Sequence, residues 1–179
     1  MKKNLFILFL IFLIPTKSFG LIEVDITRGN LNPLPLAVSP LSIDENSKKS
    51  FEKILDKENI GSEISIIVEN NLRTSGLFNP LNKDAFLQAP DIANLKPRFE
   101  DWNLIKAQAL ITGKVNYVDD KLRVEFRLWD VLAAKEMMAL AFTTVPSNWR
   151  RVGHIISDKV YERLTGEKGY FDTRITVSY

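Results

Sequence analysis

The chain of 179 residues contains no cysteine and one histidine, His154. The absence of cysteine excludes disulfide bonds, thiolate metal sites, CxxC redox centres and cysteine nucleophiles. A single histidine excludes zinc motifs that need a histidine pair, such as HExxH. An oxidising compartment remains compatible with this composition, because a chain of this length can bury enough core to fold without covalent links.

Motifs that hold phosphates or build an active site are also missing. Neither GxGxxG nor a Walker sequence occurs, and no serine lies in a GxSxG elbow. The carboxylates are scattered, since Asp119 and Asp120 form a turn pair whose separation from Glu125 and Asp130 fits neither a calcium loop nor an acid/base dyad. We therefore expect no enzyme activity, no cofactor and no metal ion.

Acidic residues are absent from the first twenty positions, which carry Lys2, Lys3 and Lys17. Without these three charges the formal net charge changes from +2 to −1. Because the remainder is nearly neutral and lacks a wide basic stripe, we do not expect nucleic acid as a partner. A content of 45% apolar and 26% charged residues is typical of an ordinary globular domain.

The sequence has one long apolar run, from Leu5 to Ile14, and it follows lysines at positions 2 and 3. Small residues come next and end at Gly20, which predicts a signal peptide over 1–20 with cleavage before Leu21. The run is shorter than the roughly 20 residues that span a bilayer. We expect a periplasmic protein with no membrane insertion after cleavage; an uncleaved N-terminal anchor is the alternative.

The segment 21–32 begins with a strict alternation of apolar and polar residues that ends near Gly29. This period is typical of a strand with one polar face, and no second strand lies nearby in the sequence to pair with it. An unpaired strand is a template for binding another protein by strand addition. The apolar positions are Ile22, Val24 and Ile26, and the polar ones are Glu23, Asp25 and Thr27.

The residues that follow predict an α+β domain. Its first half contains a short buried strand at 36–38, a loop over 42–59 with a helical turn at 51–55, a helix from 60 to 72 that stops at 75–76, an extended piece at 77–81, and one or two short helical turns near residues 99–105. Its second half contains three strands over 109–117, 122–129 and 137–145, which form an antiparallel meander. A last helix has Ser147 as N-cap and ends at Gly166.

Two groups on the last helix allow a functional interpretation. His154 and Asp158 are four residues apart, a spacing that would allow a base and its orienting carboxylate, although a surface pair is favoured because no nucleophile accompanies them. Trp149 precedes Arg150 and Arg151, a group that can stack on bases and neutralise phosphates. Trp149 as a core anchor with surface arginines is the favoured interpretation.

Several segments together resemble the TolB family, the periplasmic component of the Tol-Pal system. They are residues 21–29, 35–40, NLRTSGLF at 71–78, WRR at 149–151, and the stretch from His154 that ends in the specific block LTGEKGYFDTRI at 164–175. The resemblance implies a domain over 33–166 with a mixed sheet against two main helices. It also implies a six-bladed β-propeller in full-length members, with 167–179 as linker and first propeller strand and the propeller itself missing from this chain.

The resemblance further implies two protein partners. The N-terminal segment of the family engages the inner-membrane protein TolA, which maps to Leu21, Ile22, Glu23, Val24, Asp25, Ile26, Thr27 and Arg28. The propeller binds the outer-membrane lipoprotein Pal. The implied function is a non-enzymatic link between the membranes that supports outer-membrane invagination during division and outer-membrane integrity. A periplasmic small-ligand module is the alternative, and it requires a sizeable apolar pocket with converging polar groups.

Overall fold

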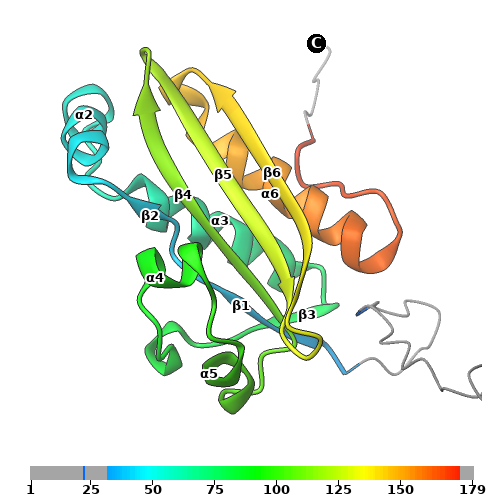
Figure 1. Cartoon of the computed structure of the whole chain (residues 1–179). Helices are drawn as coiled ribbons and strands as arrows, with labels where there is room; N and C mark the ends of the chain where they lie inside the picture. Colours follow the sequence, from blue (N-terminus) through cyan, green and yellow to red (C-terminus); the bar gives the residue numbers. More distant parts are fainter. Residues whose placement is uncertain (1–21, 23–31, 174–179) are drawn as a thin grey trace, which may run out of the picture.

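A computed structural model describes Ile22 and residues 32–173 of the chain (Figure 1). The predicted signal peptide, all of the predicted strand at 21–28 except Ile22, and the strand expected from Arg174 onward lie outside the described residues. The elements in chain order are β1 (Leu34–Val38), β2 (Ser42–Ile43), α2 (Glu45–Leu55), α3 (Ile60–Thr74), β3 (Phe78–Pro80), η1 (Lys83–Ala85), α4 (Pro90–Leu95), α5 (Phe99–Leu104), β4 (Ala109–Val118), β5 (Lys121–Asp130), β6 (Lys135–Thr144), η2 (Pro146–Asn148) and α6 (Trp149–Thr165).

The described strands form one mixed sheet of six strands. Its order is β3-β1-β4-β5-β6, and β2 pairs with β4 beyond the end of β1. β1 is parallel to β3 and β4, and β2 is parallel to β4, whereas β4, β5 and β6 are antiparallel neighbours. Helices α3 and α6 cover one face, and α4 and α5 lie over part of the other (Figure 1). The predicted α+β class and the sheet against two main helices are confirmed.

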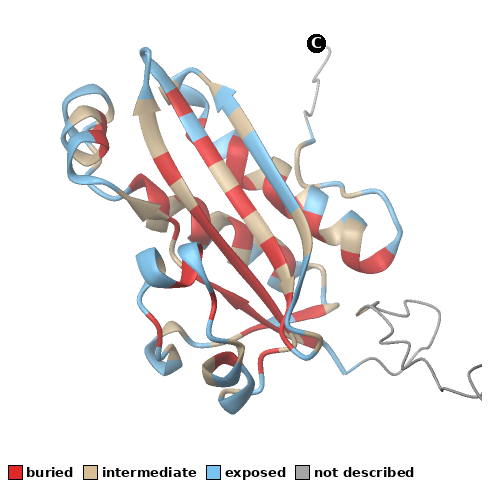
Figure 2. Ribbon diagram, viewed as in Figure 1, coloured by how far each residue is buried: buried red, intermediate tan, exposed pale blue. Residues whose placement is uncertain are grey.

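The central strand of the antiparallel meander, β5, alternates buried and more exposed side chains, whereas the first half of β4 is buried on both faces. Inward residues of β5 are almost fully buried, and the residues between them are more exposed, as Figure 2 shows. Asp119 and Asp120 turn the chain between β4 and β5 with φ of 50° and 58°, the left-handed conformation that both central residues of a type I′ turn require. Both features confirm predictions. The inward residues of β5 are Leu122, Val124, Phe126 and Leu128.

The loop predicted over 42–59 is wrong for most of its length, because α2 occupies residues 45–55. The Asp44 carboxylate accepts the N–H groups of Asn46 and Ser47 and so caps this helix. Helix α2 buries one large side chain, Phe51, whose ring packs edge-on against Tyr117 with centroids 5.5 Å apart. Leu55 also packs on the core, but the first six residues of α2 are all polar, which is why the sequence pattern suggested a loop there.

The predicted N-cap of the last helix is also wrong. Ser147 lies inside the 3-10 turn η2, and α6 begins at Trp149 after Asn148, whose side chain makes no capping hydrogen bond. The apolar residues at every fourth position of α6 are buried as predicted, and Gly166 ends the helix with φ of 75°. These residues are Val152, Ile156, Val160 and Leu164.

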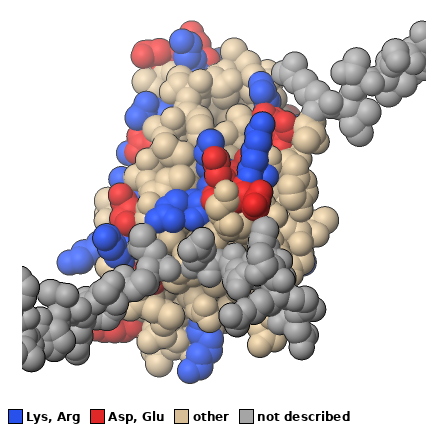
Figure 3. All heavy atoms as spheres, turned by 90° about the vertical axis from the view of Figure 1, so that its right-hand side faces the viewer, with Lys and Arg blue, Asp and Glu red and all other residues tan. Residues whose placement is uncertain are grey.

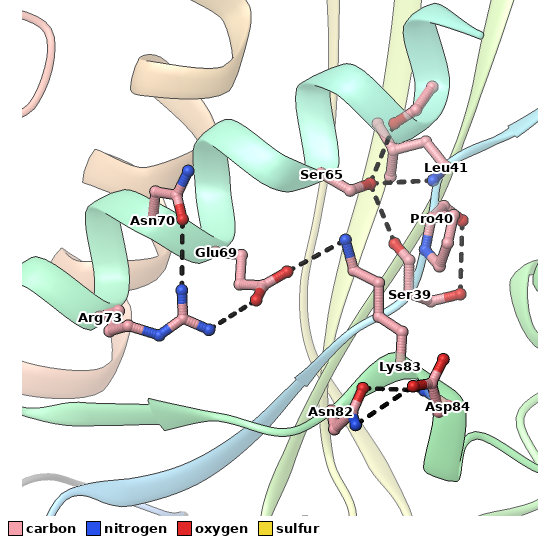
Figure 4. A network of polar contacts seen from close by, with 11 residues as sticks. Ser39, Pro40, Leu41, Ser65, Glu69, Asn70, Arg73, Asn82, Lys83 and Asp84 are labelled. Atoms are coloured by element: carbon pink, nitrogen blue, oxygen red, sulfur yellow. Dashed lines mark hydrogen bonds and ion pairs between the residues drawn. The ribbon is translucent and has the colours of Figure 1, made fainter.

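Polar contacts fasten α3 to the connection between β1 and β2 and to η1 (Figure 4). Buried Ser65 accepts the N–H of Leu41 at 3.0 Å and lies 3.1 Å from the carbonyl oxygen of Ser39. One turn further along α3, Glu69 lies between Arg73, at 2.6 Å, and Lys83 of η1, at 3.0 Å. Partial burial acts to raise the pKa of Glu69, but the hydrogen bonds from Arg73 and Lys83 prevail and hold the pKa below its usual value.

Replacing Glu69 by glutamine is expected to lower the free energy of unfolding by about 1 kcal/mol at neutral pH. A lowered pKa in the folded state stabilises the fold above the unfolded pKa, and this contribution is lost as the pH falls through the folded pKa. Urea unfolding should therefore show a smaller difference at about pH 3. Glu63→Gln, at an exposed position of the same helix, is the control and should cost less. A difference for Glu69→Gln that is the same at both pH values would contradict the interpretation.

Candidate functional site

The residue of the predicted TolA-binding segment that the structure describes, Ile22, lies against the domain body. Its side chain packs on the main core, and its N–H donates to Oδ2 of Asp130 at 3.3 Å. Asp130 is the last residue of β5 and is 1% exposed. The other seven residues, Leu21 and 23–28, lie outside the described part of the chain. Ile22 is therefore held beside a buried carboxylate.

Asp130 has a second role at the same place. Its Oδ1 accepts the N–H of Ala133 at 2.8 Å and so closes the turn between β5 and β6. Sequence reasoning treated Asp130 as one of several scattered carboxylates and missed both contacts. The turn contact is the kind that an aspartate makes with a backbone N–H a few residues ahead. The contact with Ile22 joins residues 108 positions apart, so no local sequence pattern predicts it.

The segment after α6 is fastened to the side of that helix. The carboxylate of Asp158 accepts the N–H groups of Phe171 at 2.7 Å and Asp172 at 3.1 Å. The Arg151 guanidinium donates from Nε and Nη2 to the Asp172 carboxylate at 3.0 Å each, and this hydrogen bonding raises the pKa of Arg151. Gly169 lies so close to Asp158 that a Cβ at position 169 would collide with the Asp158 backbone. Residues 169–172 thus form a clamped segment on α6.

Aromatic side chains complete this clamped segment. Tyr161 packs edge-on against Phe78 of β3, Tyr170 and Phe171, with ring centroids 5.5 to 6.1 Å apart. Burial raises the pKa of Tyr161, and the neighbouring Tyr170 and Glu167 raise it further. The block LTGEKGYFDTRI was the most specific part of the family resemblance. Within it, residues 169–172 make specific contacts with α6.

The described structure does not assemble the base and carboxylate pair that His154 and Asp158 would allow. Nδ1 of His154 lies 2.9 Å from Nδ2 of Asn71, which also donates to Ser157. Because that Asn71 nitrogen is a donor, Nδ1 of His154 acts as acceptor. Ser157 is fully buried and donates to the carbonyl oxygen of Gly153. These groups tie α6 to α3, while Asp158 binds backbone N–H groups elsewhere.

The aromatic and basic group at the start of α6 is structural. Trp149 is 3% exposed, and Arg150 stacks over its ring at 4.2 Å from the centroid. Arg151 is engaged by Asp172. Figure 3 shows Lys and Arg beside Asp and Glu on the face that it presents, without a wide patch of one sign. The interpretation of Trp149 as a core anchor is confirmed.

The described surface offers shallow hollows. One of about 620 Å³ lies beside α5 and the turn between β5 and β6, where it is lined by Phe99, Val131 and Leu132 among others. Its charged lining residues are Lys96, Arg98 and Glu100, and Arg98 is paired with Asp101 at 2.6 Å. Among residues 22 and 32–173, no group of three or more acidic or histidine side chains could hold a metal ion. No helix in this part of the chain has the length and apolarity to cross a membrane.

The described features define an α+β domain in which Asp130 binds the backbone of Ile22 and Asp158 binds the backbone of residues 171–172. The family model of the TolB amino-terminal domain matches residues 22–137. The chain is 84% identical over 173 residues to "Tol-Pal system protein TolB" of Pelagibacter ubique (strain HTCC1062), a match that covers 97% of this chain and 38% of that relative. The chain belongs to the TolB family, and it spans well under half the length of this relative.

A solved structure agrees with the fold. The crystal structure of TolB from Acinetobacter baumannii superposes with a TM-score of 0.62 at 22% sequence identity. The match covers 84% of this chain and 33% of that one. At this identity the likeness supports the shared architecture of sheet and helices.

Replacing Gly169 by alanine is expected to detach residues 169–172 from α6, because the added Cβ would collide with Asp158. Trypsin should then cleave after Lys168 at least about tenfold faster, which corresponds to ~1.4 kcal/mol of easier local opening. Each rate is divided by the rate for a free peptide of the same sequence, so that the altered cleavage site itself is corrected for.

Glu167→Ala, next to the same bond but exposed, is the matched control and should change the corrected rate less than about twofold. Equal corrected rates for Gly169→Ala and the native chain would show that the clamped segment does not protect this bond.

Proposed function

We propose that the chain acts in the periplasm as a non-enzymatic component of the Tol-Pal system and that it works by contacts with other proteins. Family membership and the 84% identical relative, which carries the Tol-Pal name, support this proposal. In this role it would serve outer-membrane invagination during division and outer-membrane integrity.

The proposed organisation has four parts. A signal peptide over 1–20 is removed between Gly20 and Leu21, a partner-binding segment covers 21–32, the α+β domain covers 33–166, and 167–179 connects onward. The described boundaries support this division, since β1 begins at Leu34 and α6 ends at Thr165. The clamped segment at 169–172 supports a connection that leaves the domain in a defined direction.

The proposed partners are TolA, through residues 21–28, and Pal, through the propeller that longer family members carry. The segment would pair its backbone with TolA by strand addition while Ile22, Val24 and Ile26 bury one face. A strand that uses backbone groups for pairing needs an apolar face more than net charge, which agrees with the near-neutral sequence after residue 20.

The observation that carries the proposal is the position of Ile22 against the domain. Its side chain packs on the core and its N–H is used by Asp130. A segment that is docked on its own domain is not available to a partner, so the docked and partner-bound states compete. This competition would make the segment a regulator of the contact with TolA.

Deleting residues 21–32 is expected to weaken binding of the TolA C-terminal domain at least hundredfold, which isothermal titration calorimetry measures. The domain lacks none of its strands or helices in this variant, so its thermal unfolding should remain cooperative. Replacing Val24 and Ile26 by serine should weaken binding as well, because the apolar face is lost. The matched control replaces Glu23 by glutamine and Thr27 by serine on the opposite face. An affinity for the TolA C-terminal domain that is unchanged by the deletion would contradict the proposal.

Replacing His154 by alanine is expected to cost about 1 kcal/mol of stability, since Asn71 loses one hydrogen-bond acceptor. The affinity for TolA and the resistance of cells to detergent should stay at the native level. Loss of cellular function with a folded protein would instead favour a catalytic role for this residue. The two readouts are calorimetry on the purified chain and growth in detergent of a strain complemented with a propeller-bearing family member that carries the same substitution.

A further inference from the structure

The hollow beside α5 has two walls that buried polar side chains hold in place. Gln88, which is 4% exposed, donates from Nε2 to the carbonyl oxygen of Lys96 at 3.0 Å and accepts the N–H of Arg98 on Oε1 at 2.9 Å. Asp130 accepts the N–H of Ala133 and so fixes the turn that forms the opposite wall. Because both walls are fixed, a binding partner would not have to order them. The lining residues are 96–100, Asn103, Val131, Leu132 and Ala134.

Exposed apolar side chains gather at this hollow. Leu132 lines it and is 62% exposed. Leu104 and Leu95, the chain neighbours of the lining residues Asn103 and Lys96, are 71% and 84% exposed. These leucines are the three most exposed large apolar side chains in the described part of the chain. Exposed apolar groups around a hollow are typical of a protein interaction site, where an anchor side chain fills the hollow and the rim excludes water.

The charges of the hollow favour a protein over a lipid surface as its occupant. Lys96 and Glu100 both line the hollow, and Arg98 is paired with Asp101 at 2.6 Å. An anionic bilayer attracts a lysine and repels a glutamate, so it cannot satisfy both. A polypeptide can place a carboxylate opposite Lys96 and a basic group opposite Glu100. The occupant that fits is therefore a protein segment with a large apolar side chain between groups of opposite charge.

The position of the hollow indicates which protein that is. Asp130 accepts the N–H of Ile22 on Oδ2 at 3.3 Å and the N–H of Ala133 on Oδ1 at 2.8 Å. One carboxylate thus joins Ile22 to the turn that supplies Leu132 to the hollow. Figure 1 shows this turn and α5 at the same end of the sheet. A protein that takes hold of the chain at Ile22 meets the hollow as the neighbouring surface of the domain.

We propose that the hollow beside α5 is a second docking site for the protein that binds the N-terminal segment, and that it receives a large apolar side chain of that protein. The inference rests on the proposed function, in which this protein is TolA, and adds to it a site on the folded domain. Two linked contacts bind more tightly than either one alone, because the second forms within the complex that the first has made. The folded domain thereby contributes to the affinity and to the choice of partner.

The test is isothermal titration calorimetry with the TolA C-terminal domain and a variant that combines Leu104→Ser with Leu132→Ser. The affinity is expected to fall at least about tenfold, because the apolar contacts of the anchor are lost. Both leucines are exposed, so thermal unfolding of the variant should remain cooperative. The matched control combines Ile54→Ser with Val118→Ser, which are 47% and 48% exposed on α2 and at the far end of β4, and should change the affinity less than about twofold.

A second variant fills the hollow and keeps the leucines. Asn103 is an exposed lining residue of α5, and Asn103→Trp would occupy the space that the anchor needs. This variant should also weaken binding at least about tenfold. In the chain without residues 21–32 the hollow is the contact that remains. Addition of the TolA domain should therefore still shift the methyl signals of Leu104 and Leu132 in NMR spectra, and Asn103→Trp should abolish these shifts.

Three results would overturn the proposal. They are a native affinity in both hollow variants, an equal loss of affinity in the control, and hollow variants that keep their affinity for TolA but no longer bind phosphatidylglycerol vesicles. The last result would assign the hollow to a membrane surface. Failure of this proposal alone leaves binding that depends on residues 21–32 and not on the hollow. Failure of the proposed function leaves no binding of the TolA domain to the native chain, so the two failures are distinguishable.

Discussion

Leu41 packs between Gly61 of α3 and Gly113 of β4, and the close packing of the helices on the sheet depends on these two contacts. A Cβ at Gly61 of α3 would collide with the carbonyl oxygen of Leu41, and a Cβ at Gly113 of β4 would collide with β5 and crowd the Leu41 side chain. Both β1 and β2 can therefore pair with β4, with Leu41 in the short connection between them. Ser65 secures the same point by accepting the Leu41 N–H. A larger residue at Gly61 would push α3 away from Leu41, and a larger residue at Gly113 would disturb the pairing of β4 with β5.

With that layer fixed, side chains on rigid elements hold Ile22 at one end of the described chain and residues 171–172 at the other. Asp130 stands at the end of β5, and Asp158 stands in the middle of α6. Each carboxylate accepts two backbone N–H groups, one pair that includes Ile22 and one pair from Phe171 and Asp172. Sites built on strands and helices hold their partners more accurately than sites built on loops. The domain therefore fixes the positions of Ile22 and of residues 171–172.

The sequence revealed those parts of the fold that repeat locally. The meander followed from period-two alternation, and α3 and α6 followed from apolar residues three or four apart. Helix α2 escaped detection because its apolar residues, Phe51, Ile54 and Leu55, are confined to its second half, while the first half is polar and begins at the Asp44 cap. Ser147 looked like an N-cap because the pattern does not distinguish a 3-10 turn from the first turn of the helix that follows.

The candidate site was less predictable for a different reason. The spacing of His154 and Asp158 correctly placed them on one helix, but each side chain is used by a partner from another element, Asn71 in one case and residues 171–172 in the other. Asp130 gave no signal because its contact with Ile22 crosses most of the chain. Local patterns describe what a residue can do, whereas long-range packing decides which partner it meets.

The clamped segment on α6 has a mechanical consequence. The N–H groups of Phe171 and Asp172 donate hydrogen bonds to the Asp158 carboxylate. Arg151, two turns earlier in the helix, donates to the Asp172 carboxylate. A pull on the chain after residue 173 is therefore delivered to the centre of α6 instead of unwinding its last turn. There α6 is braced against α3 through Ser157 and Asn71. A pull there would act on several hydrogen bonds at once and not on one alone.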